Sequence, residues 1–312
     1  MTITQLEYVI AVAKHQNFTL AAEKCNVTQP TLSMQIQKLE DELGVKIFDR
    51  NKKSVLLTEV GAEIVNQAKN VLGESERIYD IIDQQKGFIG GTFKLGVIPT
   101  ITPTLVPMFL RTFNNKYPKV LLIIEEYPTE ELIYRLKNGL LDAAIAATPL
   151  EEKNIEEKPL YYEPFVGYFP PSFALNEPYV TPDDLDVSHL LLLEDGHCFR
   201  NGVLNLCKTS KLQANNKFEI KTGNFETIVK LANEGLGVTL LPYLHTLDLK
   251  PEYQENLVAF KDPKPSREVS LIFEKSGLKA HIIEVLYETI KSVVRGAIAF
   301  YDVKIISPRL NG

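Results

Sequence analysis

Buried strands and helices alternate along the chain after a glycine-rich break at residues 87–91, and this alternation limits the possible folds more than any other feature. The apolar runs FKLGVIPT, VLLIIEE and DAAIAAT predict strands, with helices expected near 103–115 and 128–139 between them. Alternating strands and helices are typical of a parallel, doubly wound sheet with helices on its faces.

A second set of the same kind follows, which predicts a second small lobe. Its expected strands are FVGYFP, LLLLED and GVTLLP, its expected helices lie near 198–208 and 224–234, and EVSLIFE and a helix at about 278–300 come last. Ligands of such sheets bind at the carboxyl ends of strands. We therefore expect the ligand site around Pro99 and Thr100, Thr129, and Glu194 to Cys198.

The first 58 residues predict short helices that end in a hairpin. Phe18, Ala21 and Ala22 mark one amphipathic helix, and the segment CNVTQP breaks it. Apolar residues then recur with helical spacing at Leu32, Ile36, Leu39 and Leu43, and VKIFDR and SVLLT flank a basic tip. Two short helices with a tight turn at about 18–37, followed by a β-wing, are what a helix that enters the DNA major groove requires.

Residues at the start and on the open side of the second helix, and basic residues at the wing tip, are the candidate DNA contacts. They are Thr28, Gln29, Pro30, Thr31, Ser33 and Gln37 on the helix, and Arg50, Lys52 and Lys53 on the wing. The net charge of -6 hides an asymmetry, because residues 1–58 carry seven basic and six acidic residues and the remainder carries 27 and 34. This distribution is compatible with a polyanion at the N-terminal end.

A long helix is predicted over residues 58–86, with Thr58 as its N-cap. Its apolar positions alternate spacings of three and four: Val65, Ala68, Leu72, Ser75, Tyr79 and Ile82. Such a seam favours packing on a partner helix and therefore a dimer. The simpler interpretation is an amphipathic helix packed on its own domain.

Cysteine usage, together with the absence of a long apolar run, predicts a cytoplasmic protein with no membrane span and no export signal. Cys198 and Cys207 are close in sequence, and His197, Arg200 and Lys208 adjoin them. Nearby positive charge favours a reactive thiolate, but two small buried hydrophobic residues would give the same pattern. Metal-ligand spacing is absent, so no metal is expected. No cofactor motif is supported either.

Specific residues of the N-terminal region resemble the winged helix-turn-helix of LysR-type transcriptional regulators. The matching residues are Ala21-Ala22, Thr28-Gln29-Pro30, Ser33, Gln35 to Glu40, Leu43-Gly44, Phe48 to Arg50 and Leu57 to Gly61. GTFKLGVIPT, GLLDAAIA and NEGLGVTLLP also resemble the effector-binding domain of that family. The resemblance implies a winged helix-turn-helix in residues 1–58, a long linker helix in 59–91, and a two-lobed, periplasmic-binding-protein-like α/β regulatory domain in 92–312. We expect lobe I at about 92–164 and 268–300, and lobe II at about 165–267.

The segment LLLEDGHCFR, followed by NLC, is similar to the redox segment of the peroxide-sensing LysR-type regulators. The resemblance implies that Cys198 reacts with hydrogen peroxide, that Cys207 forms a disulfide with it, and that Thr100, Thr129, His197 and Arg267 form the peroxide pocket. It further implies promoter DNA, a homodimer or homotetramer, RNA polymerase, and a glutaredoxin- or thioredoxin-like reductant as partners. Activation and repression are not distinguished.

Two other functions are left open by the sequence. One is a LysR-type regulator that answers a small metabolite and has structural cysteines. The other is a thiol peroxidase, which leaves the N-terminal module unexplained. We expect a regulator and not an enzyme.

Overall fold

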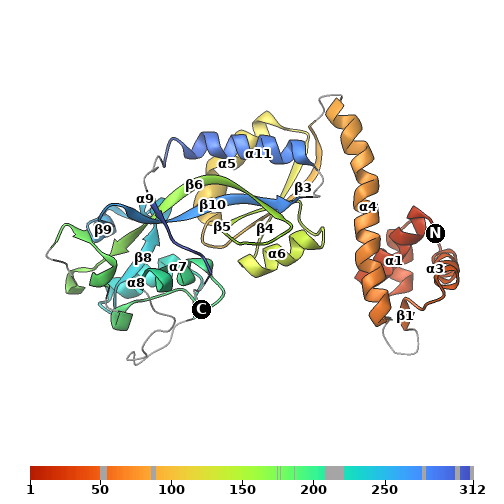
Figure 1. Cartoon of the computed structure of the whole chain (residues 1–312), viewed down its shortest axis with the longest axis horizontal. Coiled ribbons are helices and arrows are strands. Elements are labelled where there is room, and N and C mark those ends of the chain that lie inside the picture. The colour runs from red at the N-terminus through yellow and green to blue at the C-terminus, as the bar shows by residue number, and fades with distance from the viewer. Residues whose placement is uncertain are drawn as a thin grey trace. The chain divides into compact units, whose positions relative to one another are not determined.

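The structure, a computed structural model, describes residues 1–49, 55–85, 89–173, 175, 177–185, 187–207, 221–275, 279–298 and 303–309. The chain forms two compact units, Met1–Phe88 and Ile89–Gly312 (Figure 1).

The first unit contains four helices and a small hairpin among its described residues. They are α1 (Ile3–His15), α2 (Phe18–Lys24), α3 (Gln29–Leu43), β1 (Phe48–Asp49), β2 (Leu56–Leu57) and α4 (Glu59–Gln85). β1 and β2 pair antiparallel, with Phe48 opposite Leu57. The predicted helix-turn-helix, wing strands and long helix are therefore confirmed.

Side-chain caps set the starts of these helices, as their sequence suggests. Thr28 accepts a hydrogen bond from the Thr31 amide at the start of α3, and Thr58 accepts one from the Gly61 amide at the start of α4. Gly44 ends α3 with a φ of 70°. Gly61 has to lack a side chain, because a Cβ there would lie 2.1 Å from the Ile47 carbonyl oxygen.

The apolar stripe of α3 forms the core of the first unit with α1 and α4. Leu32, Ile36 and Leu39 are fully buried, and Val65 and Ala68 of α4 pack in the same core. The first turns of the predicted seam thus pack within their own unit, as the simpler interpretation expected. The side chains of Tyr79 and Ile82 lie outside the described part of the chain.

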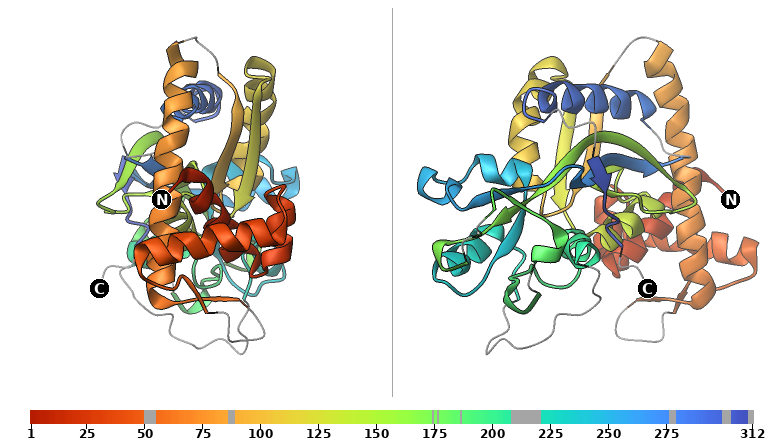
Figure 2. Two further views of the ribbon diagram at one scale, coloured as in Figure 1. Left: turned by 90° about the vertical axis from the view of Figure 1, so that its right-hand side faces the viewer. Right: turned by 60° about the vertical axis from the view of Figure 1, so that its left-hand side comes forward.

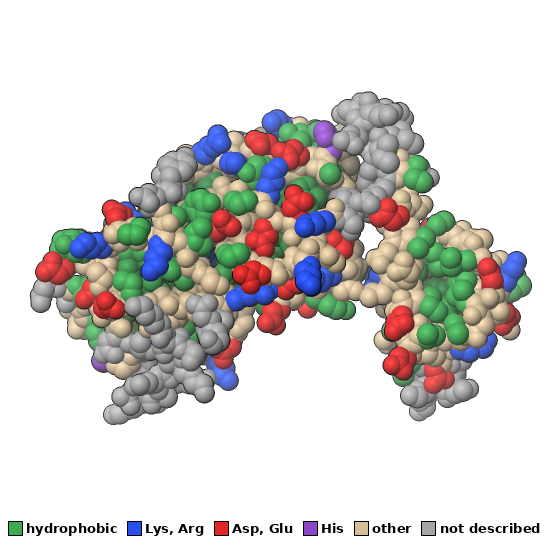
Figure 3. Space-filling model, in the orientation of Figure 1, with side chains coloured by type: hydrophobic (Ala, Val, Ile, Leu, Met, Phe, Trp, Pro, Cys, Tyr) green, Lys and Arg blue, Asp and Glu red, His purple; other side chains and the backbone are tan. Residues whose placement is uncertain are grey.

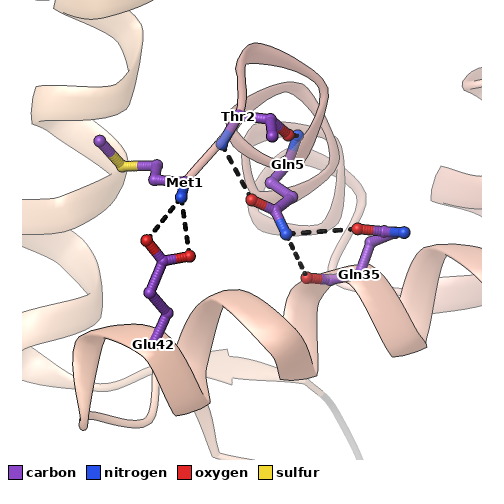
Figure 4. Close-up of polar contacts among 5 residues, drawn as sticks. All are labelled: Met1, Thr2, Gln5, Gln35 and Glu42. Atoms are coloured by element: carbon purple, nitrogen blue, oxygen red, sulfur yellow. Dashed lines mark hydrogen bonds and ion pairs between the residues drawn. The ribbon is translucent and has the colours of Figure 1, made fainter.

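Polar contacts also tie α1 to α3 (Figure 4). The Gln5 side-chain amide donates to the Gln35 side-chain oxygen at 3.2 Å and to its carbonyl at 3.4 Å. The amino group of Met1 lies 2.6 Å from a carboxylate oxygen of Glu42. These contacts fix the orientation of α3 on α1.

A buried carboxylate links α3 to the wing. Glu40 is 1% exposed, and its Oε1 accepts hydrogen bonds from the amides of Ile47 at 2.8 Å and Phe48 at 3.2 Å. Glu40→Ala leaves both buried donors without this acceptor, so the first unit is expected to lose about 2–3 kcal/mol of stability. Native-state hydrogen exchange of the α1 and α3 amides measures this loss in the full-length protein.

Glu42→Ala is the matched control for that change. Glu42 is half exposed, and its ion pair with the Met1 amino group lies at the surface. Its loss is expected to change stability by less than about 1 kcal/mol. Equal exchange rates in the two variants would show that Glu40 does not support the wing.

The second unit is a mixed sheet with helices on both faces. Its strands are β3 (Gly91–Val97), β4 (Val120–Glu126), β5 (Ala143–Thr148), β6 (Ile155–Tyr168), β7 (Tyr179–Val180), β8 (Thr239–Pro242), β9 (Leu257–Phe260), β10 (Lys264–Glu274) and β11 (Val303–Ile305). Its helices are α5 (Thr102–Lys116), α6 (Thr129–Lys137), α7 (Cys198–Leu206), α8 (Phe225–Asn233), α9 (Tyr243–Leu247), α10 (Pro251–Gln254) and α11 (Ala280–Val294). In the first half of the sheet, α5 and α11 cover one face and α6 the other (Figures 1 and 2).

Strand directions differ from the predicted parallel sheet. The main strand order is β4-β3-β5-β10-β6-β9-β7, with β8 paired to β6 and β11 to β10. β3, β4 and β5 are parallel, as predicted, but β10 pairs antiparallel with both β5 and β6. The predicted strand LLLLED is also wrong, because only Leu190 of this run makes an isolated bridge, to Val238.

Two hydrophobic cores define two lobes. The core of lobe I lies around β3, β5, α5 and α11, and that of lobe II around α7, α8 and β8. The long strands β6 and β10 connect them: β6 pairs with β10 up to Pro164 and then with β8 from Phe165. A two-lobed α/β unit is thus confirmed.

Candidate functional site

The exposed side of α3 carries the predicted DNA-contacting residues that the structure describes. Leu32, Ile36 and Leu39 point into the core, whereas Gln29, Thr31 and Gln37 are exposed. Thr28 and Pro30 are also exposed, and Ser33 is half-buried. Arg50, Lys52 and Lys53 lie outside the described residues. On the face of the second unit visible in Figure 3, basic and acidic side chains are interspersed and form no broad basic patch.

The two cysteines of interest lie at opposite ends of α7 and pack against different cores. Cys198 is the first residue of the helix, is 7% exposed, and belongs to the core of lobe I. Cys207 follows the last turn and packs against the core of lobe II. Both are free thiols. The helix predicted over this segment is confirmed, so one element links the two cores through its end residues.

Arg267 is the buried cation of the site. It lies on β10, is 3% exposed, and donates from Nη1 to the Thr100 hydroxyl at 2.9 Å and from Nη2 to the Thr100 carbonyl at 3.2 Å. Its Nε donates to Glu163 Oε2 at 2.8 Å, and its guanidinium lies 5.2 Å from the centre of the Phe199 ring. The structure thus brings together Arg267 and Thr100, two of the residues that the resemblance assigned to the peroxide pocket.

Thr129 is the first residue of α6, and its buried hydroxyl acts on the Cys198 thiol. Its Oγ1 makes no hydrogen bond to an oxygen or nitrogen of the described residues. Thr129 does not serve as the N-cap of α6, because Pro128 occupies that position. A buried hydroxyl that bonds no oxygen or nitrogen keeps hydrogen-bonding capacity, which a small polar molecule beside the sulfur is able to use.

Opposing effects act on the sulfur of Cys198. Burial raises the pKa of the Cys198 thiol, whereas the charge of Arg267, the Thr129 hydroxyl and the amides of Ala147 and Phe199 act to lower it. The chemistry of this sulfur therefore depends on a few fixed dipoles and one buried cation. Burial alone raises the pKa of Cys207, to about 11.

His197 and Arg200, which flank Cys198 in sequence, make their contacts elsewhere. The ring of His197 lies 3.9 Å from Glu194, and a Cβ on Gly223 would come within 2.7 Å of its Nε2. Burial lowers the pKa of His197, so the ring is neutral at pH 7. Arg200 binds Asp195 at 2.8 Å and the Leu193 carbonyl. The cation that acts on Cys198 is Arg267, which is distant in sequence.

A segment near the end of the chain, residues 303–309, contacts α7; we call it the strap. The Asn205 amide donates to the carbonyls of Ser307 at 3.0 Å and Arg309 at 2.5 Å. Ile306 is buried in the lobe II core, and its amide donates to the Ser266 carbonyl on β10 at 2.8 Å. The strap therefore ties α7 to the strand that carries Arg267.

Neither a metal site nor a membrane-spanning helix is found in the described part of the chain. No group of three His, Cys, Asp or Glu side chains is arranged to hold a metal ion. No described helix combines the length and the apolar character needed to cross a membrane.

The fold and the site define a class of protein: a DNA-binding helix-turn-helix joined to a two-lobed regulatory unit. Residues 3–62 match the bacterial regulatory helix-turn-helix of the lysR family, and residues 86–295 match the LysR substrate binding domain. The chain therefore belongs to the LysR family.

Similar proteins cover almost the whole chain. It is 34% identical to the hydrogen peroxide-inducible genes activator of Pectobacterium carotovorum subsp. carotovorum over 300 residues, which cover 95% of this chain and 98% of the relative. It is also 34% identical over 300 residues to the DNA-binding transcriptional dual regulator OxyR of Escherichia coli K12, covering 95% and 97%.

Solved structures agree with this relationship. A full-length OxyR variant from Pseudomonas aeruginosa has a TM-score of 0.76 and 36% identity, covering 93% of this chain and 98% of that one. An H2O2-bound OxyR mutant of Corynebacterium glutamicum has a TM-score of 0.63 and 25% identity, covering 99% and 98%.

Proposed function

We propose that this protein is a transcriptional regulator that senses hydrogen peroxide through Cys198. The observation that carries the proposal is the surrounding of that sulfur: a buried guanidinium on Arg267 and a buried hydroxyl on Thr129 both act on it, in a chain related to peroxide-responsive activators. Hydrogen peroxide both donates and accepts hydrogen bonds, so the hydroxyls of Thr129 and Thr100 suit it. His197 then borders the pocket without binding the sulfur.

The first step is an attack of the Cys198 thiolate on peroxide. An S–O bond forms, the O–O bond breaks, and the departing hydroxide takes a proton to become water, which leaves a sulfenic acid. Arg267 stabilises the thiolate by its charge. In the second step the Cys207 thiolate attacks the sulfenic sulfur: an S–S bond forms, the S–O bond breaks, and the departing hydroxide takes up a proton and leaves as a second water.

The second step requires a change of structure. Because α7 is helical from Cys198 to Leu206, the Cα atoms of Cys198 and Cys207 are roughly 13 Å apart at ~1.5 Å per residue. A disulfide needs a Cα separation of about 4.4–6.8 Å. The helix therefore has to unwind, and each cysteine belongs to a different core, so the disulfide alters the contacts between the lobes.

The first unit delivers this signal to promoter DNA. We propose that Thr28, Gln29, Pro30, Thr31, Ser33 and Gln37 contact the major groove or its phosphates, and that Arg50, Lys52 and Lys53 contact the backbone from the wing. Residues 59–91 act as the linker and dimerisation helix with its hinge, between the domains 1–58 and 92–312. A cytoplasmic homodimer or homotetramer, RNA polymerase, and a glutaredoxin- or thioredoxin-like reductant complete the proposed system.

Thiol labelling of the full-length protein tests this function. Iodoacetamide-treated protein is analysed by mass spectrometry under denaturing conditions, before and after one equivalent of peroxide. We expect labelling at Cys198 and Cys207 to be lost together, with a mass decrease of two hydrogens, while Cys25 stays labelled. Unchanged labelling would instead support a metabolite-responsive regulator with structural cysteines. Continuous turnover of peroxide with a reductant would support a thiol peroxidase.

A further inference from the structure

Glu163 is a buried carboxylate that the sequence did not single out. It lies on β6 directly opposite Arg267 of β10 and is 1% exposed. The two side chains form an ion pair, with Arg267 Nη2 2.7 Å from Glu163 Oε2. Its other oxygen accepts a hydrogen bond from the Leu244 amide, at the start of α9, at 2.8 Å. Glu163 is thus fixed between a strand and a helix.

The hydrogen bonds of Arg267 among the described residues go to Glu163 and Thr100. Arg267 therefore acts on the sulfur of Cys198 through its charge. A carboxylate 2.7 Å from the same guanidinium offsets part of that charge where the sulfur lies. Removing the carboxylate leaves a buried cation that still acts on the Cys198 sulfur.

We propose that Glu163 is a positioning residue that restrains the reactivity of Cys198: it holds Arg267 against Thr100 and offsets the charge that Arg267 presents to the sulfur. The inference rests on the proposed peroxide-sensing function. It adds a residue that sets the threshold of the response without touching peroxide.

The other titratable groups around this pair are neutral near pH 7. Burial raises the pKa of the Tyr161 phenol on β6 well above its usual value, and burial lowers the pKa of His245 on α9. Burial likewise lowers the pKa of His197, beside Cys198. Within this cluster Arg267 is therefore the charge that acts on the sulfur, and Glu163 is the charge that acts on Arg267.

Glu163→Gln tests the proposal in full-length protein in which Cys25 and Cys207 are serine, so that Cys198 is the sole thiol. Two quantities are measured: the ultraviolet absorbance of the thiolate against pH, and the rate of reaction with peroxide at pH 7. We expect the thiolate to form at lower pH and the rate to rise roughly tenfold. Glu163→Asp keeps the charge and is expected to stay near the parent protein.

An Arg267→Gln background separates an effect through Arg267 from a direct effect on the sulfur. There, adding Glu163→Gln is expected to leave the thiolate titration unchanged. The double variant has neither charge of the ion pair, so it also avoids an unpaired buried cation if Glu163→Gln alone fails to fold. A folded Glu163→Gln protein with an unchanged or higher titration midpoint would overturn the proposal. So would a shift in the Arg267→Gln background. If Cys198 of the parent protein did not react with peroxide, the proposed function itself would be refuted.

Discussion

Replacing Cys198 with serine is expected to abolish the response to peroxide while leaving DNA binding intact. A serine hydroxyl does not attack peroxide at neutral pH and forms no bond to Cys207, so α7 stays helical. Cys198 lies in the second unit, whereas α3 and the wing strands lie in the first. Footprinting on promoter DNA with and without peroxide measures both parts: the footprint should persist and no longer change with the oxidant.

Two further cysteine variants serve as matched comparisons. Cys207→Ser is expected to react with peroxide and gain an oxygen atom, yet to form no intramolecular disulfide and no altered footprint. Cys25→Ser is expected to respond like the wild type, because Cys25 lies between α2 and α3 in the first unit and, unlike Cys198, has no cation of the described residues that lowers its pKa. A full response in Cys198→Ser would assign the reaction with peroxide to another group and refute sensing through Cys198.

The order of elements was predictable from the sequence, but not the direction of the strands. Apolar runs mark buried strands whichever way they run, so β10 looked the same as the parallel strands β3 and β5. Its antiparallel pairing depends on contacts far apart in sequence, such as Leu271 opposite Ile145. The strand predicted for LLLLED was wrong for a related reason. Its leucines pack in the lobe II core, and an apolar run is able to do so without pairing in a sheet.

The site was predictable where a residue type fitted a known pattern. Thr100, Thr129 and Arg267 were named by resemblance; in the structure Thr129 and Arg267 act on the Cys198 thiol, and Thr100 accepts hydrogen bonds from Arg267. Local sequence pointed instead to Arg200 as the nearby cation, which binds Asp195. Glu163 was missed, although a charged residue inside the apolar run YYEPFVGY is itself a signal that a buried partner exists.

Disulfide formation is expected to release the strap, residues 303–309, from α7. Asn205 lies between the two cysteines and donates to the carbonyls of Ser307 and Arg309, so unwinding α7 removes both hydrogen bonds. The Ile306 side chain then loses packing in the lobe II core, which weakens the hydrogen bond from its amide to the Ser266 carbonyl. Loss of two such bonds corresponds to about tenfold or more in local opening.

Hydrogen exchange measured by mass spectrometry, on reduced and peroxide-treated protein, follows this release. Peptides that cover α7 and the strap should exchange faster after oxidation, while those of α11 should not change, because α11 packs on α5 and β6. Asn205→Ala should loosen the strap even in reduced protein, and Cys207→Ser should block the oxidative effect. If the strap kept its protection once the disulfide had formed, the rearrangement would have to spare Asn205. The structural change would then be confined to the ends of α7 and would not reach β10 through the strap.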